Sequence, residues 1–526
     1  MKKLVLIVII GLLSLSIHGQ SYLWEESVYV HLSKDIFSVG EPVAFSMIID
    51  SSDTTFTPST GYIEIADRNG IPVYQAIVPL IKGQNTSLFI LPSQIKSDNY
   101  LLRAYSRSSP FTSKKGVYNQ FVTIINPDKP PVSKEKIGIK TTNTEAGKNK
   151  SLINKKEFTK NEEFELDHSV EEIISISLKN PFLEDQYQGH INENIYKVLN
   201  QNLKITEPWG HVIHAKNNSK NLDKNYYISA HGEQNYFNQA KPNLDDEMFF
   251  DLGPFKSFTF LLTQSEDQAS YNDMEIIPPF IAFEFLDQFN IPHLNIDLSH
   301  EKFLESLLLA GQVESYFYKP LKIEGKKINT QIFPDKTYYL DDYNRFENVE
   351  ITFKEYIPEV HVRKSDKQTI FKVINASSGN VFQNNPLILI DNLPIFDSNA
   401  FADFDPKNIE RIEIVTRSFF FNNHQFSGAI SLTSKNGAFG GFSLPEKALY
   451  LDYYQILPSI QFHQQSTDVK TNYPDFRSLL LWKSSNQSLP NRPIISTSNI
   501  SGKYQIKKSV RKGQAWEVIT DWFEVK

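Results

Sequence analysis

A short, wholly apolar run at residues 387–390, Leu-Ile-Leu-Ile, constrains the fold of this chain most strongly. Successive side chains of a β-strand point to opposite faces, so the two isoleucines would lie on one face and the two leucines on the other. Because both faces are apolar, the pattern predicts a central strand that is covered on both sides. Asp391-Asn392 follows directly, and residues of these types form tight turns.

Two further motifs follow this run in a fixed order: DPKNIER at residues 405–411 and GAISLTSK at residues 428–435. Together with PLILIDNLP at 386–394, they resemble the plug domain of TonB-dependent outer-membrane receptors. The resemblance implies an α+β plug-like domain, expected at 336–445. Two positions depart from the family pattern, because Asn392 and Asn422 stand where the family has glycine. Asparagine still tolerates the positive φ that such turns require.

A plug normally sits inside a barrel, and only 89 residues follow Gly437 in this chain of 526. Even an eight-stranded barrel would use about 72–88 residues in its strands alone. The tail also contains breaks such as Leu489-Pro490-Asn491. The sequence therefore predicts a plug-like domain without a barrel of its own.

The first residues predict the compartment. Residues 1–19 combine Lys2 and Lys3 with an apolar run from Leu4 to Leu15, which is typical of a secretory signal peptide. The chain has no cysteine, which argues against a lipid anchor after the signal and excludes disulfides and thiolate zinc sites. We therefore expect a periplasmic protein that is associated with the outer membrane through a protein partner.

Composition favours a β-rich fold and argues against nucleic acid as a partner. Aromatic residues make up 13% of the chain, with 38 Phe and 24 Tyr, and such side chains suit half-buried strands. The formal net charge is −7, whereas a nucleic-acid-binding protein would show a basic footprint.

Residues 20–127 alternate as short strands separated by turns, as in a β-sandwich. Asp67-Arg68-Asn69-Gly70 predicts a hairpin, because Asn and Gly accept positive φ. The segments Val28–Glu41 and Leu91–Ser106 resemble the first and last segments of macroglobulin-like domains. The resemblance implies a strut or binding module without catalysis.

The other boundaries follow from composition and local pattern. Residues 128–156 are rich in lysine and poor in large apolar side chains, which predicts a linker. An apolar stripe at Glu301–Phe317 predicts a helix that packs on a core. The remaining predicted units are a β-module at 157–204, a sandwich at 205–280 that resembles carboxypeptidase regulatory-like domains, a helical connector at 281–335, and C-terminal β-strands at 446–526 that complete a sandwich. The predicted fold class is mainly β, with tandem antiparallel β-sandwiches plus the α+β plug-like domain.

No motif for catalysis, a cofactor or a metal is recognised. Three carboxylate clusters, near Asp245, Asp341 and Asp403, are interpreted as turn and cap residues. His211 and His214 would face opposite sides of a strand, so a shared metal ion is not expected. The sequence therefore favours a protein that is not an enzyme.

The function expected from these patterns is docking onto an outer-membrane β-barrel protein, either a transporter or a secretion channel, which the plug-like domain would plug in trans. Arg417, Phe419, Phe420 and Phe421 are the expected contact residues, because Arg and aromatic side chains dominate interfaces. The alternative is a substrate-binding or signalling accessory of a TonB-dependent transport system. An envelope enzyme is a third and weaker alternative.

Overall fold

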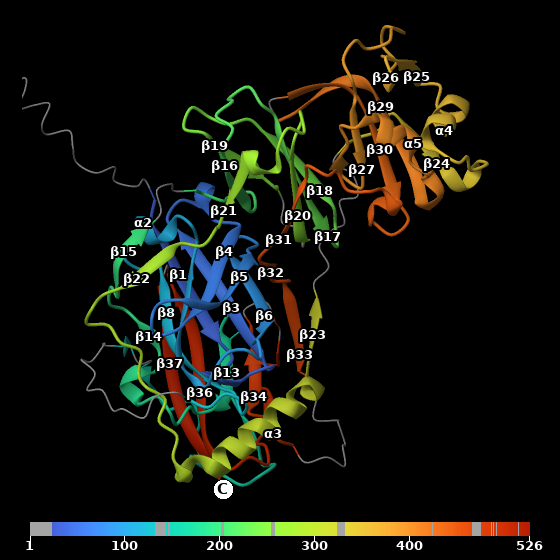
Figure 1. Cartoon of the computed structure of the whole chain (residues 1–526). Helices are drawn as coiled ribbons and strands as arrows, with labels where there is room; N and C mark the ends of the chain where they lie inside the picture. Colours follow the sequence, from blue (N-terminus) through green and yellow to red (C-terminus); the bar gives the residue numbers. More distant parts are fainter. Residues whose placement is uncertain are drawn as a thin grey trace, which may run out of the picture.

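The computed structural model describes residues 24–131, 144–145, 148–169, 171–200, 205–253, 258–322, 332–422, 424–464, 475–484, 487, 489–490, 492–513 and 515–526. The predicted signal peptide at 1–19 lies outside these residues. The chain is mainly β and forms three two-sheet sandwiches and one further domain (Figure 1). No helix within the described ranges is long and apolar enough to cross a membrane.

The first sandwich is built mainly from residues 26–125, where the alternating pattern predicts strands, and three short later strands extend one of its sheets. Val28, Val30 and Leu32 point from one strand into its core, between the two sheets. The predicted hairpin at 67–70 joins β4 to β5, and Gly70 has a φ of 78° there. One sheet contains β1 (Glu26–Leu32), β3 (Pro42–Ser51) and β6 (Gln84–Ile90), and the other contains β2 (Ile36–Ser38), β4 (Thr60–Ala66), β5 (Pro72–Pro79), β7 (Asp98–Tyr105), β8 (Tyr118–Ile125), β9 (Thr144–Glu145), β14 (His190–Ile191) and β32 (Gln455–Ile456). A single helical turn, α2 (Ser109–Thr112), lies between β7 and β8.

The second sandwich encloses a core that includes Ile213, Tyr226, Phe250 and Leu261. Its strands come from residues 212–277 and from one later segment, 449–452. One sheet has the order β19 (Glu247–Asp251), β16 (Val212–Asn217), β21 (Met274–Ile277), and the other has the order β18 (Tyr236–Ala240), β17 (Tyr226–Gly232), β20 (Phe258–Ser265), β31 (Leu449–Asp452). A separate ribbon pairs β15 (Tyr196–Asn200) with β22 (Ala282–Phe285).

In the C-terminal sandwich, the predicted β-module at 157–204 shares a sheet with the C-terminal strands, which were expected to complete a sandwich. Its central strand β13 lies between β34 and β36, so two segments about 300 residues apart in sequence share one core. Residues 148–158 of the chain also run beside β37, and Ile153 is buried in that core, so the predicted linker ends before residue 148. The strands are β10 (Lys148–Asn149), β11 (Glu157–Phe158), β12 (Glu163–Glu165), β13 (Ile173–Leu178), β34 (Leu479–Lys483), β35 (Ile494–Ser496), β36 (Gly502–Lys512) and β37 (Ala515–Val525).

Helix α3 (Glu301–Phe317) occupies the range that the apolar stripe predicts. Leu307 and Ala310 are fully buried, and Leu307 packs with Ile36 of the first sandwich. The stripe therefore packs on the molecule's own core. After α3, β23 (Tyr318–Lys322) pairs antiparallel with β33 (Ile460–Gln464).

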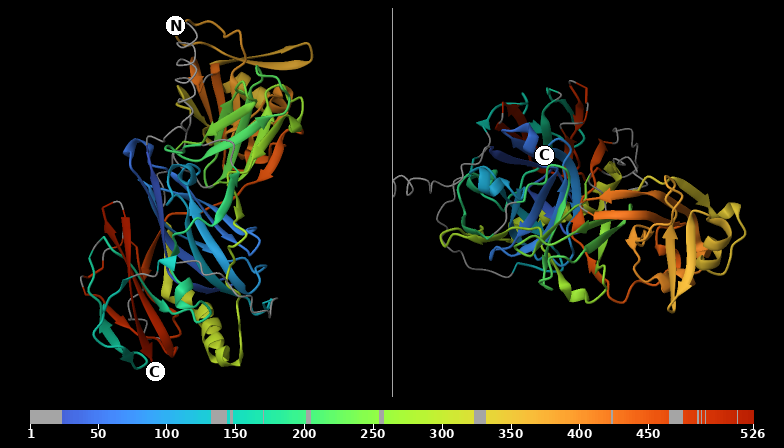
Figure 2. Two further views of the ribbon diagram at one scale, coloured as in Figure 1. Left: turned by 90° about the vertical axis from the view of Figure 1, so that its left-hand side faces the viewer. Right: turned by 90° about the horizontal axis from the view of Figure 1, so that it is seen from above.

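Residues 332–442 form a separate domain, here called the insert domain, because the chain leaves after β23 and returns to β33. On the way back, β31 adds to the second sandwich and β32 to the first. Figures 1 and 2 show the insert domain beside the second sandwich at one end of an elongated molecule, with the C-terminal sandwich at the other end. Residues 446–526, which were expected to complete a sandwich, therefore contribute strands to all three sandwiches.

The insert domain contains a five-stranded sheet, two helices and a two-stranded ribbon. The helices, α4 and α5, and the ribbon cover one face of the sheet. The sheet order is β24 (Lys336–Tyr339), β29 (Ile409–Phe421), β30 (His424–Ser434), β27 (Leu387–Ile390), β28 (Leu393–Pro394), and the other elements are α4 (Val349–Tyr356), α5 (Ser398–Asp403), β25 (Val360–Ser365) and β26 (Gln368–Val373).

The prediction for the run at 387–390 is confirmed. Strand β27 lies between β28 and β30, and all four of its side chains are buried. The two isoleucines enter the core of the insert domain. The two leucines enter a second apolar cluster, which includes Tyr227 and Phe237 of the second sandwich.

Candidate interaction groove

A groove of about 510 Å³ lies between the sheet of the insert domain and the loop 232–235 of the second sandwich. Pockets at domain junctions are common binding sites. Several motif residues that do not enter the core line this groove. They are Asp391, Asn392, Glu410, Arg411, Ser431, Thr433 and Lys435, together with Glu413, Val415 and Ala429 of the same sheet.

The floor of the groove is polar because the sheet alternates its side chains. Ile412 and Ile414 of β29 enter the core, whereas Arg411 and Glu413 face the groove, and their side chains lie 3.3 Å apart. Asp391 fixes one end, because its carboxylate accepts hydrogen bonds from the backbone N–H groups of Ser434 and Phe439, each at 2.8 Å. The groove therefore offers paired charges and hydrogen-bonding groups on a rigid strand floor.

The other half of the same sheet face is apolar and packs on the second sandwich. Leu387, Leu389 and Phe426 lie against Tyr227 and Phe237 in one cluster. Burial of each such side chain contributes roughly 1.5–3 kcal/mol. The insert domain is therefore attached to the scaffold by a packed interface, beyond its two chain connections.

Asn392 and Asn422, the two turn asparagines noted in the sequence, both contact the second sandwich. Both have positive φ, 66° for Asn392 and 51° for Asn422, as the sequence predicts for these turns. The Asn392 amide donates to the backbone oxygen of Asn235 at 2.6 Å. The Asn422 amide donates to Asn238 Oδ1 at 2.6 Å and to the backbone oxygen of Gln239 at 2.8 Å. A glycine at either position would keep the turn and lose these hydrogen bonds.

The structure separates the four predicted contact residues into two pairs. Phe419 and Phe421 are half-buried against the cluster with Tyr227, and the ring of Phe421 stacks on Phe237 with centroids 4.5 Å apart. These two rings are therefore less accessible to a partner than Phe420. Phe420 is 73% exposed, and the side chain of Arg417, which forms an ion pair with Asp335, is 47% exposed.

Sequence reasoning did not single out Tyr227 and Phe237, the residues of the second sandwich that hold the insert domain. Strand pairs and domain contacts between distant segments leave no local pattern, so nothing near these residues identifies the interface. Asn392 and Asn422 are residues noted in the sequence that contact this interface.

His231 also lies at this interface, between Phe260 and Phe439, with ring centroids 5.1 and 4.8 Å away. Burial lowers the pKa of His231 to about 4, an effect that the nearby Asn235 amide opposes only in part. The imidazole is therefore neutral at pH 7 and packs as an aromatic ring.

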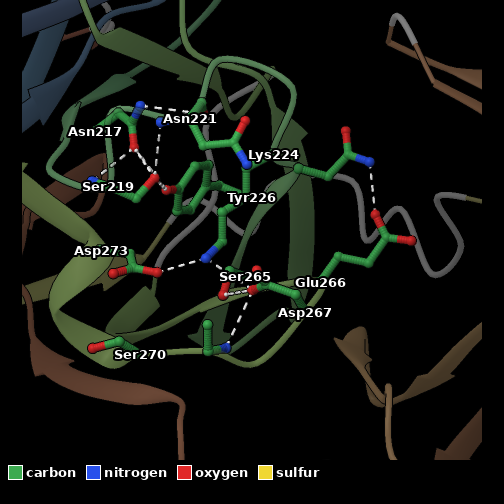
Figure 3. Close-up of polar contacts among 12 residues, drawn as sticks. Asn217, Ser219, Asn221, Lys224, Tyr226, Ser265, Glu266, Asp267, Ser270 and Asp273 are labelled. Atoms are coloured by element: carbon green, nitrogen blue, oxygen red, sulfur yellow. Dashed lines mark hydrogen bonds and ion pairs between the residues drawn. The ribbon is translucent and has the colours of Figure 1, made fainter.

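A charged cluster at the loop end of the second sandwich connects loops of that sandwich through ion pairs (Figure 3). The amine of Lys224 lies 2.9 Å from Asp267 and 2.5 Å from Asp273. Burial alone would lower the pKa of Lys224, but these two hydrogen bonds outweigh it and raise the pKa. Beside them, the Tyr226 hydroxyl donates to Asn217 Oδ1 at 2.7 Å. The lysine thus forms an ion pair with both carboxylates. No group of three His, Asp or Glu side chains in the described part of the chain could hold a metal ion.

The carboxylate clusters serve as caps and ion-pair partners. Asp405 caps a short helical turn through the backbone N–H of Lys407. Arg345 and Lys435 hold the pKa of the Asp341 carboxyl below its usual value. Asp246 occupies a turn with a φ of 62° and pairs with Lys220.

His211 lies just before β16 and His214 lies within it, and the two side chains have separate surroundings. His211 contacts Glu207, Tyr62 and Tyr453, whereas His214 contacts Glu247 and Phe249.

A second cavity, of about 190 Å³, lies between the first and C-terminal sandwiches. Its charged lining groups are paired, because Lys507 lies 3.0 Å from Asp35 and Lys179 lies 2.7 Å from Asp185. The groove beside the insert domain is larger and carries the motif residues, so it is the stronger candidate site.

Replacing Asn392 and Asn422 together by glycine is expected to loosen the insert domain without unfolding it. Glycine adopts positive φ freely, so the turns should persist. The lost hydrogen bonds should lower the stability of the interface by about 1–3 kcal/mol in total. Hydrogen exchange should rise in β17 and β18 while β27 and β30 remain protected. Asn69→Gly, in a turn of the first sandwich, is the control, and equal exchange in the double variant and the wild type would contradict the prediction.

Comparisons with known proteins bear on the fold only. No protein-family model and no curated protein matches the chain. Among solved structures, the CARDB domain of a Pyrococcus furiosus protein in complex with di-metal ions has 16% identity and a TM-score of 0.16, and the match covers 20% of this chain and 94% of that domain. Salmonella alpha-2-macroglobulin reacted with methylamine has 6% identity and a TM-score of 0.16, covering 95% of this chain and 23% of that one.

Escherichia coli alpha-2-macroglobulin activated by porcine elastase has 6% identity and a TM-score of 0.21, covering 95% of this chain and 44% of that one. The chain thus spans less than half the length of these two alpha-2-macroglobulins. The likeness is weak throughout, and the fold class rests on the chain's own strands and sheets, which make it mainly β with tandem sandwiches.

Proposed function

We propose that this chain is a non-enzymatic protein of the Gram-negative envelope that docks onto an outer-membrane β-barrel through its insert domain. The three sandwiches act as a scaffold, and the insert domain is a plug-like module that covers the periplasmic mouth of a transport or secretion channel in trans. The partner supplies the attachment to the outer membrane.

The observation that carries this proposal is the placement of the three plug-like motifs. They form one folded unit that is inserted between β23 and β33, at one end of the scaffold (Figure 1). In the described part of the chain, the strands that follow this unit join the sandwiches or pair with β23. The arrangement favours presentation of the module to another protein.

The packed interface favours docking at the mouth of a barrel over full insertion into its lumen. One half of the sheet face is covered by Tyr227 and Phe237, so the second sandwich would have to enter the lumen with the module. Docking leaves this interface intact and uses side chains that are exposed, such as Phe420.

The groove supports a second candidate, a substrate-binding accessory of a TonB-dependent transport system. A cavity of about 510 Å³ is large enough for a small polar molecule, and Arg411 and Glu413 would be its specific contacts. Binding of a soluble ligand in the absence of any barrel would favour this role.

The test is co-purification of tagged full-length protein with detergent-solubilised outer membranes of its host. Wild-type protein should retain a barrel, and Arg417→Ala with Phe420→Ala should reduce its yield at least about tenfold, since such side chains contribute about 1–2 kcal/mol each at interfaces. Both side chains are exposed, so the melting temperature should stay nearly constant. Leu298→Ala, at a residue that is 90% exposed on the connector, is the matched control. Wild-type protein that retains no barrel would overturn the proposal.

A further inference from the structure

The β25–β26 ribbon of the insert domain has one apolar and one basic face. Cross-strand pairs assign the faces, because Val362 pairs with Phe371 on the inner side and Arg363 pairs with Ile370 on the outer side. The inner face is anchored where Phe371 packs on Phe401, with ring centroids 5.0 Å apart. The ribbon is therefore held rigidly, and its outer face is open to solvent.

The outer face and the turn carry cationic side chains with little acidic compensation. His361 lies opposite Lys372 in the strand register, and Arg363 is the next residue of β25 on the same face. Asp366 and Lys367 form the two-residue turn, with φ of 48° and 67°. Lys364 lies on the inner side and pairs with Glu350 at 3.1 Å. Within the described ranges, neither Arg363 nor Lys367 takes part in an ion pair.

The surroundings of Lys372, the lysine on this face, change its pKa. Burial and the neighbouring Arg363 guanidinium lower the pKa of Lys372. Its amine donates to the backbone oxygen of Gln383, an uncharged acceptor that does not offset the charge of Arg363. An anionic group placed over Arg363 and Lys372 would relieve this repulsion.

The ribbon has a positive net charge, whereas the whole chain has a negative one. The whole chain has a formal net charge of −7 and residues 360–373 have one of +3, so the rest of the chain carries −10. An acidic partner would be repelled by most of the protein and attracted here, which steers both its approach and its orientation. Figure 1 shows the ribbon on the side of the insert domain away from the second sandwich.

We infer that the outer face of the β25–β26 ribbon docks an acidic protein segment. This inference rests on the proposed function and assigns the segment to the mouth of the partner barrel. A protein segment fits better than a lipid surface, because the turn at Ser365–Gln368 is polar, carries Asp366, and has no apolar side chain to enter a membrane.

Binding of fluorescently labelled poly-glutamate to the full-length protein in 50 mM NaCl tests the ribbon directly. Wild-type protein should bind, and 300 mM NaCl should weaken binding at least about tenfold, since exposed charges are screened. Arg363→Glu with Lys367→Glu should weaken binding by a similar factor, with an unchanged melting temperature because both side chains are exposed. The control is Lys114→Glu with Lys160→Glu, which changes the net charge of the protein by the same amount at positions outside the insert domain. This variant should bind poly-glutamate as the wild type does.

Two further results separate this inference from the proposed function. If both double variants bind poly-glutamate alike, the ribbon is not the site and the inference fails, whether or not barrels co-purify. Binding to phosphatidylglycerol vesicles without binding to poly-glutamate overturns it in favour of a lipid surface. If poly-glutamate binds through the ribbon but solubilised outer membranes yield no barrel, the proposed function fails and the assignment to a barrel mouth falls with it, while the acidic-segment site remains.

Discussion

Replacing Ile390 by aspartate is expected to unfold the insert domain, whereas Leu389→Asp should detach it while leaving it folded. Both side chains are fully buried and adjacent in β27, so the two variants differ mainly in the face they alter. Ile390 enters the core of the insert domain itself, together with Ile412 and Leu432. A carboxylate there has no route to water, and the loss should be at least about 4 kcal/mol.

Leu389 points instead toward Tyr227 and Phe237 of the second sandwich. A carboxylate on this face regains water when the two domains separate, so the cost is limited to the lost contact between them. We therefore expect the domain to remain folded and to move away from the sandwich.

Peptide-resolved hydrogen exchange distinguishes the two outcomes. In Ile390→Asp, protection should be lost throughout β27, β29 and β30. In Leu389→Asp, these strands should stay protected, and exchange should rise in β17 and β18. Ile71→Asp, at a residue that is 58% exposed on the first sandwich, serves as the control. Identical exchange patterns in the two variants would show that the faces of β27 are not independent.

The two faces of β27 differ in how far they could be predicted from the sequence. The apolar run at 387–390 predicts a strand covered on both sides, because alternation is a local property of the backbone. What covers the leucine face could not be predicted, since Tyr227 and Phe237 lie about 150 residues earlier and look like ordinary strand residues. Hairpins and α3 were predictable for the same local reason.

The sheets that combine distant segments were not predictable. Strand β13 looks like the start of an independent module, yet its neighbours β34 and β36 lie about 300 residues later. The pairing of distant strands depends on the packing of the whole sheet, so the sequence of one strand does not identify its partners. The candidate site was likewise only partly predictable. Its motif residues could be recognised in the sequence, whereas the loop 232–235 that lines the other side of the groove could not.

The second large effect is expected at the junction of the first and second sandwiches, where Glu207 is buried. Its carboxylate accepts hydrogen bonds from the Tyr62 hydroxyl at 2.7 Å and from the backbone N–H of Val212 at 2.9 Å. His211 Nδ1 lies 3.0 Å away and Arg107 Nη1 lies 3.4 Å away. One carboxylate therefore joins β4, the end of β7 and the start of β16.

Glu207→Ala should destabilise the protein by about 3–5 kcal/mol, because it leaves the buried Arg107 guanidinium without its counter-ion. Tyr62→Phe removes the hydroxyl that donates to Glu207 and lies 3.2 Å from His211 Nδ1, but it leaves the ion pair intact and should cost only about 1 kcal/mol. Glu207→Leu combined with Arg107→Met removes both charges and should recover much of the loss. Chemical denaturation of the four proteins at pH 7 gives these differences directly.

The pH dependence of the same difference provides an independent check. Burial by itself would raise the pKa of Glu207, but Arg107 and His211 outweigh it, and the net shift is downward. A lowered pKa in the folded state means that the carboxylate stabilises the protein above its ordinary pKa of 4.5, and that this stabilisation is lost as the pH falls through the folded value. The gap between wild type and Glu207→Ala should therefore be full at pH 7 and narrow below pH 4.5. A gap that stays constant down to pH 3 would mean that Glu207 stabilises the junction through packing, and that the ion pair with Arg107 contributes little.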